Sequence, residues 1–231
     1  MSNNSRARKA IPTEKLSTVK EIVDSNCNKL LGEMKDKHAA LADDIGISVS
    51  LFYPAHPRVK SFYSYGYAGP NQQAITPATI FAMGSVTKVF TASLAAWLSA
   101  NGTIDNLENT LVAPILGPSV SESDYWNSLT LKDLATQTSG MPKNSPGKPS
   151  VNLFRGHEPS PLFVDWWNNT NDQNSWLADL NTKWIYSNAG FVTLGFAVVN
   201  AAINAGLASN YAQLLGNVIT APLGMNDSFV F

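Results

Sequence analysis

The arrangement of apolar and polar residues along the chain predicts both helices and strands. Between Thr13 and about Leu41, apolar residues recur every three or four positions among charged ones, which predicts an amphipathic helix. The segments Ile45–Tyr53 and Val59–Tyr67 are short and rich in β-branched and aromatic residues, which predicts an antiparallel hairpin. Residues 188–204 are apolar almost all round, which predicts a buried helix.

A further helix is predicted after Gly84, where the glycine allows a close approach of the backbone, and it ends at Asn101-Gly102. We expect one apolar stripe of this helix to face the core. The stripe consists of Val86, Val89, Phe90, Leu94, Trp97 and Leu98.

Short helices and loops follow. One helix is predicted with Thr130 as its N-cap and Gly140 at its end, and two more over residues 161–168 and 211–219. The stretch between Pro142 and Pro161 is rich in Pro, Gly and Ser, which predicts an extended surface loop.

Ser85 and Lys88 lie three positions apart at the start of the predicted helix, so the lysine amine can reach the serine hydroxyl. A serine becomes a good nucleophile when a neighbouring base takes its proton, and a lysine with a lowered pKa can be that base. The helix N-terminus adds a partial positive charge where an oxyanion would form. The pattern therefore indicates acyl transfer through a serine ester. The alternative is a serine that only caps a core helix.

The spacing alone is not specific, because Ser17–Lys20 and Ser145–Lys148 share it. The first pair lies in a charged amphipathic run. The second lies among prolines and a glycine, where no helix starts cleanly. Only Ser85 has a turn before it and a predicted buried helix after it.

A second motif, Tyr186-Ser-Asn188, leads directly into the apolar helix. The same Tyr-x-Asn pattern occurs at Tyr125-Trp-Asn127, but only Tyr186 stands just before a predicted buried helix. A phenol whose pKa is lowered by lysine ammonium groups is suited to shuttle a proton near a catalytic serine. The amide of Asn188 can donate to a substrate carbonyl and hold the lysine in place.

Composition narrows the functional classes. Sixteen basic and seventeen acidic residues give a net charge of −1, which argues against nucleic acid as a partner. The only cysteine is Cys27, so no internal disulfide is expected. His38, His56 and His157 are far apart, and we expect surface histidines and no metal site. No apolar run approaches the ~20 residues that span a bilayer, and no export signal is visible, so either the protein stays in the cell or its signal has been replaced.

Four motifs in this order, over about residues 14–231, resemble the serine β-lactamase and penicillin-binding protein superfamily. The resemblance is strongest to class C β-lactamases, D-Ala-D-Ala carboxypeptidases and related esterases, and the Tyr-Ser-Asn form favours the last two branches. The motifs are Phe81-x-x-Gly84-Ser85-Val-Thr-Lys88, Leu131-x-x-Leu134-Ala-Thr-Gln-Thr138-Ser-Gly140, Tyr186-Ser-Asn188 and Pro222-Leu-Gly-Met225.

The resemblance implies roles for the matching residues. Ser85 would be the acylated nucleophile, and its N–H would be one oxyanion donor. Lys88 would accept the proton or hold charge beside it. Tyr186 would protonate the leaving group and then activate water, and Asn188 would bind the substrate's amide side chain. The implied substrates are β-lactams, D-Ala-D-Ala peptides or small esters, with no metal and no organic cofactor. A periplasmic or secreted location is also implied.

The implied fold is α/β (α+β) and β-lactamase/transpeptidase-like. Residues 1–12 would be a disordered tail, 13–81 part of the α/β domain, 82–225 a mostly helical domain, and 226–231 the start of a further α/β part. The catalytic side chains would meet in a groove between the domains. Thr138-Ser-Gly140 would shape the loop beside the site, and Pro222–Met225 would be a packing turn.

One departure from the family pattern leaves the function open. The family's Lys-Thr-Gly motif, or a close variant, is absent from the chain, and family members usually continue well beyond this length. We therefore expect an incomplete sheet, whose open edge invites pairing with another chain. Three interpretations remain: a truncated form with little activity, a protein completed by a second chain or by swapping between copies, or a non-catalytic binding protein.

Overall fold

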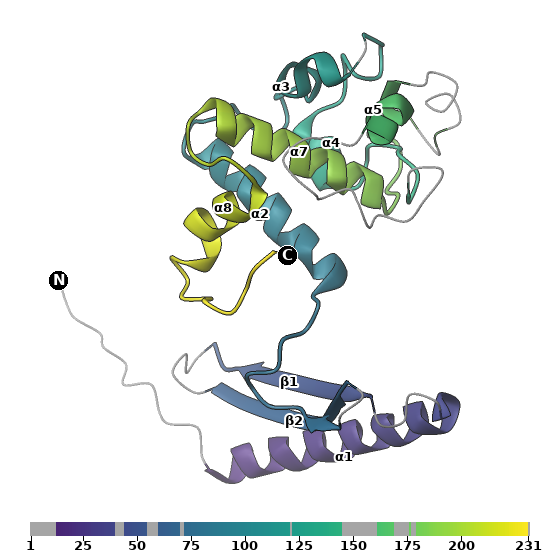
Figure 1. Ribbon diagram of the computed structural model, residues 1–231, viewed down its shortest axis with the longest axis vertical. Helices are drawn as coiled ribbons and strands as arrows, with labels where there is room; N and C mark the ends of the chain where they lie inside the picture. Colours follow the sequence, from purple (N-terminus) through teal and green to yellow (C-terminus); the bar gives the residue numbers. More distant parts are fainter. Residues whose placement is uncertain are drawn as a thin grey trace, which may run out of the picture. The chain divides into compact units, whose positions relative to one another are not determined.

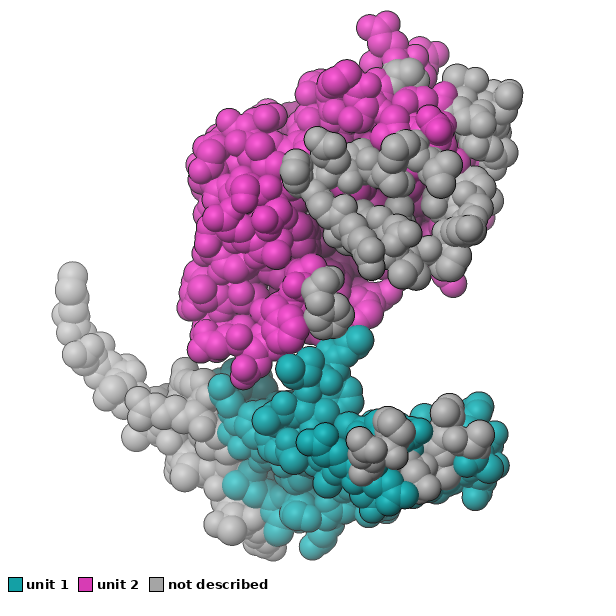
Figure 2. All heavy atoms as spheres, viewed as in Figure 1, with its two compact units in different colours: residues 1–82 teal, residues 83–231 magenta. Residues whose placement is uncertain are grey.

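The computed structural model describes residues 13–39, 44–54, 60–69, 72–120, 122–144, 161–168, 176 and 179–230. The chain divides into two compact units, residues 1–82 and 83–231 (Figure 2). The tail predicted over residues 1–12 and most of the predicted loop between Pro142 and Pro161 lie outside the described residues. The assignment of the units to two domains of the implied fold stays a prediction.

The first unit combines one long helix with a small antiparallel sheet (Figure 1). Helix α1 spans Thr13–Lys37 and packs against strand β2. The sheet has the order β1-β2-β3, with β1 over Gly46–Phe52, β2 over Lys60–Ala68 and β3 over Gln73–Ala74. The predicted helix and hairpin are confirmed. Strand β3 was not predicted, because two residues are too few to establish an alternation.

Two features of the first unit depend on single residues, Tyr65 and Gly66. The Tyr65 hydroxyl donates a 2.6 Å hydrogen bond to the Asp24 carboxylate and so joins β2 to α1. Gly66, at the end of the β1–β2 pairing, has a φ of 75°, and a Cβ there would lie 2.1 Å from the Ile45 carbonyl oxygen. A side chain at this position would therefore be excluded both by the backbone conformation and by space.

The second unit is helical, and helix α7 forms its centre (Figure 1). Helices α2, α3, α4 and α8 all contact α7, and the buried apolar residues of the unit form one cluster around it. The elements are η2 (Gly84–Val86), α2 (Thr87–Ala100), α3 (Ala113–Leu116), η3 (Gly117–Ser119), α4 (Leu131–Ala135), α5 (Pro161–Asn168), α7 (Asn188–Asn204), α8 (Tyr211–Leu215) and the π-helical turn η4 (Gly216–Thr220). The prediction of a buried helix over residues 188–204 is confirmed.

The predicted buried stripe of α2 is partly wrong. Leu94 and Leu98 are fully buried, but the other residues of the buried face are Thr91 and Ala95. Three members of the predicted stripe are instead exposed, namely Val86 (56%), Val89 (64%) and Trp97 (37%). The small side chains at Thr91 and Ala95 leave room for a neighbouring helix to approach. A count of apolar residues does not detect such a face.

Helix α4 begins as predicted but ends early. Thr130 and Asp133 form a capping box: the Thr130 hydroxyl accepts from the Asp133 N–H, and the Asp133 carboxylate accepts from the Thr130 N–H. The helix ends at Ala135 and not at Gly140, because Gln137 has a left-handed backbone with a φ of 64°. This turn redirects the chain toward the segment that carries Tyr186.

Replacing Thr130 with alanine is expected to lower the free energy of unfolding by about 0.5–2 kcal/mol, because the capping hydrogen bonds at the start of α4 are lost. Thr130→Ser keeps the hydroxyl and is the matched control. Urea denaturation followed by far-UV circular dichroism measures both variants. Equal loss of stability in the two would contradict a capping role.

Across the described residues, no helix is both long and apolar enough to pass through a membrane.

Candidate active site

Ser85 lies in the turn η2, one residue after Gly84 and just before α2. Gly84 has a φ of 51°, and no described atom comes within 4 Å of a Cβ built there. The glycine therefore serves the left-handed turn and not the close backbone approach that we predicted. The N-cap positions of η2 and α2 are Met83 and Val86, and neither makes a side-chain capping bond. Ser85 is thus not a helix cap.

The structure brings all four predicted site residues together within the second unit. Lys88 Nζ donates to Ser85 Oγ at 3.3 Å, and Tyr186 Oη donates to Ser85 Oγ at 2.5 Å. Lys88 Nζ also donates to Asn188 Oδ1 at 2.7 Å. One side of this cluster comes from η2 and α2, and the other from the start of α7. The groove expected between the two domains stays a prediction.

Lys88 lowers the pKa of Tyr186. The Lys88 ammonium group lies 4.8 Å from the centroid of the Tyr186 ring. The largest cause of the shift is the hydrogen-bonding interaction between Lys88 and the phenol, and the second is the hydrogen bond to Ser85. Both lower the pKa of Tyr186 below the ordinary value of 10.0. A phenol with a lowered pKa exchanges its proton more readily near neutral pH. The Tyr186 hydroxyl contacts the hydroxyl of Ser85, the candidate nucleophile of the cluster.

Asn188 connects Lys88 to the loop that follows α4. Its Oδ1 faces Lys88, while its Nδ2 donates to Asn144 Oδ1 at 2.9 Å and its backbone N–H donates to the Lys143 carbonyl at 2.8 Å. These bonds fix the amide with its oxygen toward the ammonium group. Asn144 was not predicted as a site residue, because the quoted motif in this loop ends at Gly140.

Ser187, between the two motif residues, is fully buried and starts α7. Its hydroxyl donates to the Pro142 carbonyl at 2.7 Å and accepts from the Gly190 N–H at 2.8 Å. The second bond is an N-cap of the helix. Ser187 thus anchors the backbone between Tyr186 and Asn188, so its role is structural.

Two residues of the other sequence matches, Lys20 and Tyr125, have partners of their own. Lys20 pairs with Asp24 on α1, and the pair Ser145–Lys148 lies outside the described residues. The Tyr125 hydroxyl is buried and donates to the Ser139 carbonyl at 2.8 Å, and burial raises the pKa of Tyr125. Tyr125 therefore stabilises the loop that contains Ser139, and its hydroxyl bonds there and not to Ser85.

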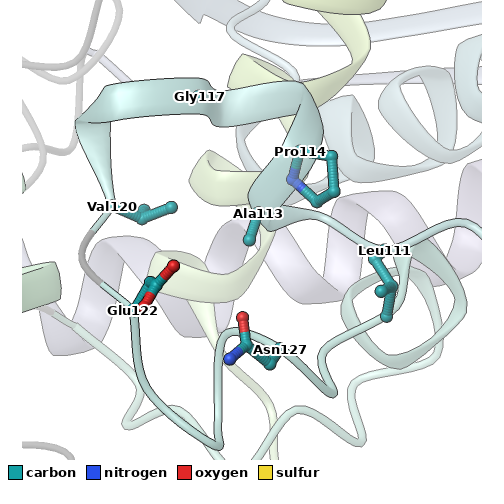
Figure 3. Close-up of a pocket in the computed structure, with 7 residues that line it drawn as sticks. All are labelled: Leu111, Ala113, Pro114, Gly117, Val120, Glu122 and Asn127. Carbon is teal, nitrogen blue, oxygen red and sulfur yellow. The ribbon is translucent and has the colours of Figure 1, made fainter.

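A recess of about 260 Å³ opens elsewhere in the second unit (Figure 3). Its lining combines apolar side chains with one carboxylate and one amide, and none of the four site residues contributes. The lining residues are Leu111, Ala113, Pro114, Gly117, Val120, Glu122 and Asn127. The described parts of the chain also contain no group of three His, Cys, Asp or Glu side chains placed to hold a metal ion.

Comparison with known proteins identifies the family of the chain. A family model described as Beta-lactamase matches residues 41–231. The chain belongs to the beta-lactamase family. Among curated relatives, a beta-lactamase of Escherichia coli (strain K12) is 28% identical over 189 residues, which cover 80% of this chain and 43% of the relative. The D-alanyl-D-alanine-carboxypeptidase/endopeptidase AmpH of the same strain is 29% identical over 176 residues, 72% of this chain and 41% of that protein.

A solved class C beta-lactamase from Rhodobacter sphaeroides matches with a TM-score of 0.57 and 27% identity, over 84% of this chain and 48% of that one. The chain therefore has the β-lactamase/transpeptidase-like fold that the resemblance implied. It spans less than half the length of the two curated beta-lactamase-family relatives.

Proposed function

We propose that this protein is a serine hydrolase that forms an acyl-enzyme on Ser85. The observation that carries the proposal is the position of Ser85 Oγ, which lies 2.5 Å from Tyr186 Oη and 3.3 Å from Lys88 Nζ. A hydroxyl within hydrogen-bond reach of two groups that can hold a proton has the arrangement of an activated nucleophile.

In the proposed reaction, Ser85 Oγ attacks a carbonyl carbon while its proton passes to whichever of Lys88 and Tyr186 is unprotonated. The carbonyl oxygen becomes an oxyanion, to which the Ser85 backbone N–H would donate. When the tetrahedral intermediate collapses, the bond to the leaving group breaks, and Tyr186 supplies the proton that the leaving group needs. Tyr186 then takes a proton from water, and the water oxygen attacks the ester carbonyl carbon. The bond to Ser85 Oγ breaks, and the serine recovers its proton from the group that accepted it in the first step.

The proposed substrates are β-lactams, D-Ala-D-Ala peptides and small esters. The curated relatives, a beta-lactamase and a D-alanyl-D-alanine-carboxypeptidase/endopeptidase, support the first two. Asn188 is proposed to contact the substrate's amide side chain, since its Nδ2 carries a second donor besides the one directed at Asn144. The alternative is a non-catalytic binding protein, or a chain that needs a second polypeptide to complete its site.

Incubation with a fluorescent penicillin, followed by intact-protein mass spectrometry, is expected to reveal one adduct per chain. The adduct should be lost in Ser85→Ala. The matched control is Ser17→Ala, because Ser17-Thr-Val-Lys20 has the same Ser-x-x-Lys spacing on α1. That variant should be labelled like the wild type.

Hydrolysis of nitrocefin, measured in parallel, separates the branches of the family. Turnover without a lasting adduct indicates a β-lactamase, and a stable adduct indicates a carboxypeptidase-like enzyme. Neither adduct nor turnover, in a chain that circular dichroism shows to be folded, would contradict the proposal and favour the non-catalytic alternative.

A further inference from the structure

We infer that Gln137 is a positioning residue that holds Tyr186 at Ser85. It does so by binding the backbone on both sides of the tyrosine. The Gln137 carbonyl oxygen accepts from the Ile185 N–H at 2.8 Å, and its side-chain Oε1 accepts from the Ser187 N–H at 2.7 Å. One residue thereby restrains both neighbours of Tyr186.

The geometry of an extended chain explains why one residue can make both bonds. Successive N–H groups of an extended backbone point to opposite sides, so those of Ile185 and Ser187 share a side. Ser187 has the extended values of φ −127° and ψ 116°. The tyrosine between the two bonds then has little freedom to translate or twist its backbone.

Gln137 is itself held in an unfavourable state. Its backbone has a φ of 64°, in the left-handed region that residues other than glycine rarely adopt, and the residue is only 8% exposed. Such a conformation persists where the surrounding structure determines it strongly. The left-handed turn is what brings both the carbonyl and the side chain of Gln137 to the same extended segment.

Other bonds near Tyr186 serve a different purpose. The Pro142 and Lys143 carbonyls accept from Ser187 Oγ and from the Asn188 N–H, and both of these bonds lie on the α7 side of the tyrosine. They fix the start of the helix. Among the hydrogen bonds of the described residues, those of Gln137 are the ones that flank Tyr186 on both sides. The catalytic value of this positioning rests on the proposed function, but the positioning itself does not.

The test is the pKa of Tyr186, measured by NMR on chains labelled with ¹³Cζ-tyrosine and assigned with Tyr186→Phe. The variant is Gln137→Asn, because asparagine tolerates the left-handed backbone but is one methylene too short to reach the Ser187 N–H. The matched control is Gln213→Asn on α8. There, Gln213 Oε1 also accepts a backbone N–H at 2.7 Å, from Ser209.

In the wild type and in Gln213→Asn, the Tyr186 pKa should lie below 10. In Gln137→Asn it should rise toward the ordinary value of a free tyrosine, since the phenol loses its fixed contact with Lys88 and Ser85. A folded Gln137→Asn chain with a wild-type Tyr186 pKa overturns the inference. So does a Gln137→Asn chain that fails to fold while Gln213→Asn folds, because Gln137 would then serve global stability.

The outcome is separable from that of the proposed function. A raised Tyr186 pKa in Gln137→Asn, together with no penicillin adduct in the wild type, would support the positioning role and contradict the hydrolase. A wild-type Tyr186 that titrates at its ordinary value would overturn the positioning role, because no phenol would then be held at Lys88.

Discussion

Lys88→Met is expected to lower the rate of Ser85 acylation by about 10²–10⁴-fold, the usual contribution of a positioned proton-transfer group. The methionine keeps most of the side-chain length but removes the ammonium group. That group donates to both Ser85 Oγ and Asn188 Oδ1. The serine then loses one of its two proton partners. The remaining partner, Tyr186, loses the positive charge that makes its proton easier to release.

Two measurements check this expectation. The rate of adduct formation with a fluorescent penicillin gives the kinetic effect, and Lys20→Met on α1 is the control from the matching Ser-x-x-Lys sequence. The Tyr186 pKa gives an independent result: removal of the ammonium group should raise it, so that the phenolate appears only at higher pH. Wild-type acylation in Lys88→Met would show that Tyr186 alone activates the serine.

Trp167→Ala is expected to lower the free energy of unfolding by about 3–5 kcal/mol, because a large, fully buried ring is replaced by a cavity. The indole N–H of Trp167 donates to Thr193 Oγ1 on α7 at 3.0 Å, and its ring lies 4.6 Å from the Phe163 ring and 6.0 Å from the Phe196 ring. The substitution removes the packing between α5 and α7 and leaves a buried hydroxyl without this donor.

The matched control is Trp184→Ala, because Trp184 is 64% exposed. That substitution should change the unfolding free energy by no more than about 0.5 kcal/mol. Urea denaturation followed by far-UV circular dichroism avoids any dependence on the fluorescence of the deleted tryptophan. Comparable losses in the two variants would mean that burial does not determine the contribution of these rings.

The sequence predicts features that follow from local patterns of residues. Helix α7 could be predicted because its residues are apolar on every side, and a helix of that kind is stable only when buried. Ser85 and Lys88 could be paired because three positions of helix bring two side chains together. The convergence of Tyr186 on Ser85 could be expected only from the resemblance to a family, since no local pattern connects residues 101 positions apart.

The structural features that the sequence did not predict depend on contacts in the folded chain and not on residue type. The buried face of α2 includes Thr91, whose hydroxyl bonds to the Tyr211 hydroxyl at 2.8 Å. A stripe predicted from apolar residues alone leaves out such a polar position. Gln137 lies within one of the quoted motifs, but its residue type does not indicate its contacts, because glutamine is common on surfaces. Its importance comes from a left-handed backbone that the neighbouring threonines and Gly140 do not reveal.

The origin of the two partners of Ser85 has a consequence for how the site is assembled. The lysine is one helical turn away and can meet the serine as soon as that turn forms. Tyr186 contacts Ser85, and Asn188 contacts Lys88, only when α7 packs against α2. Contacts between residues this distant in sequence require the chain between them to be folded back, which costs conformational entropy. The proposed nucleophile therefore has both of its partners only in the folded helical unit. Acylation of Ser85 would then also report that this unit has folded.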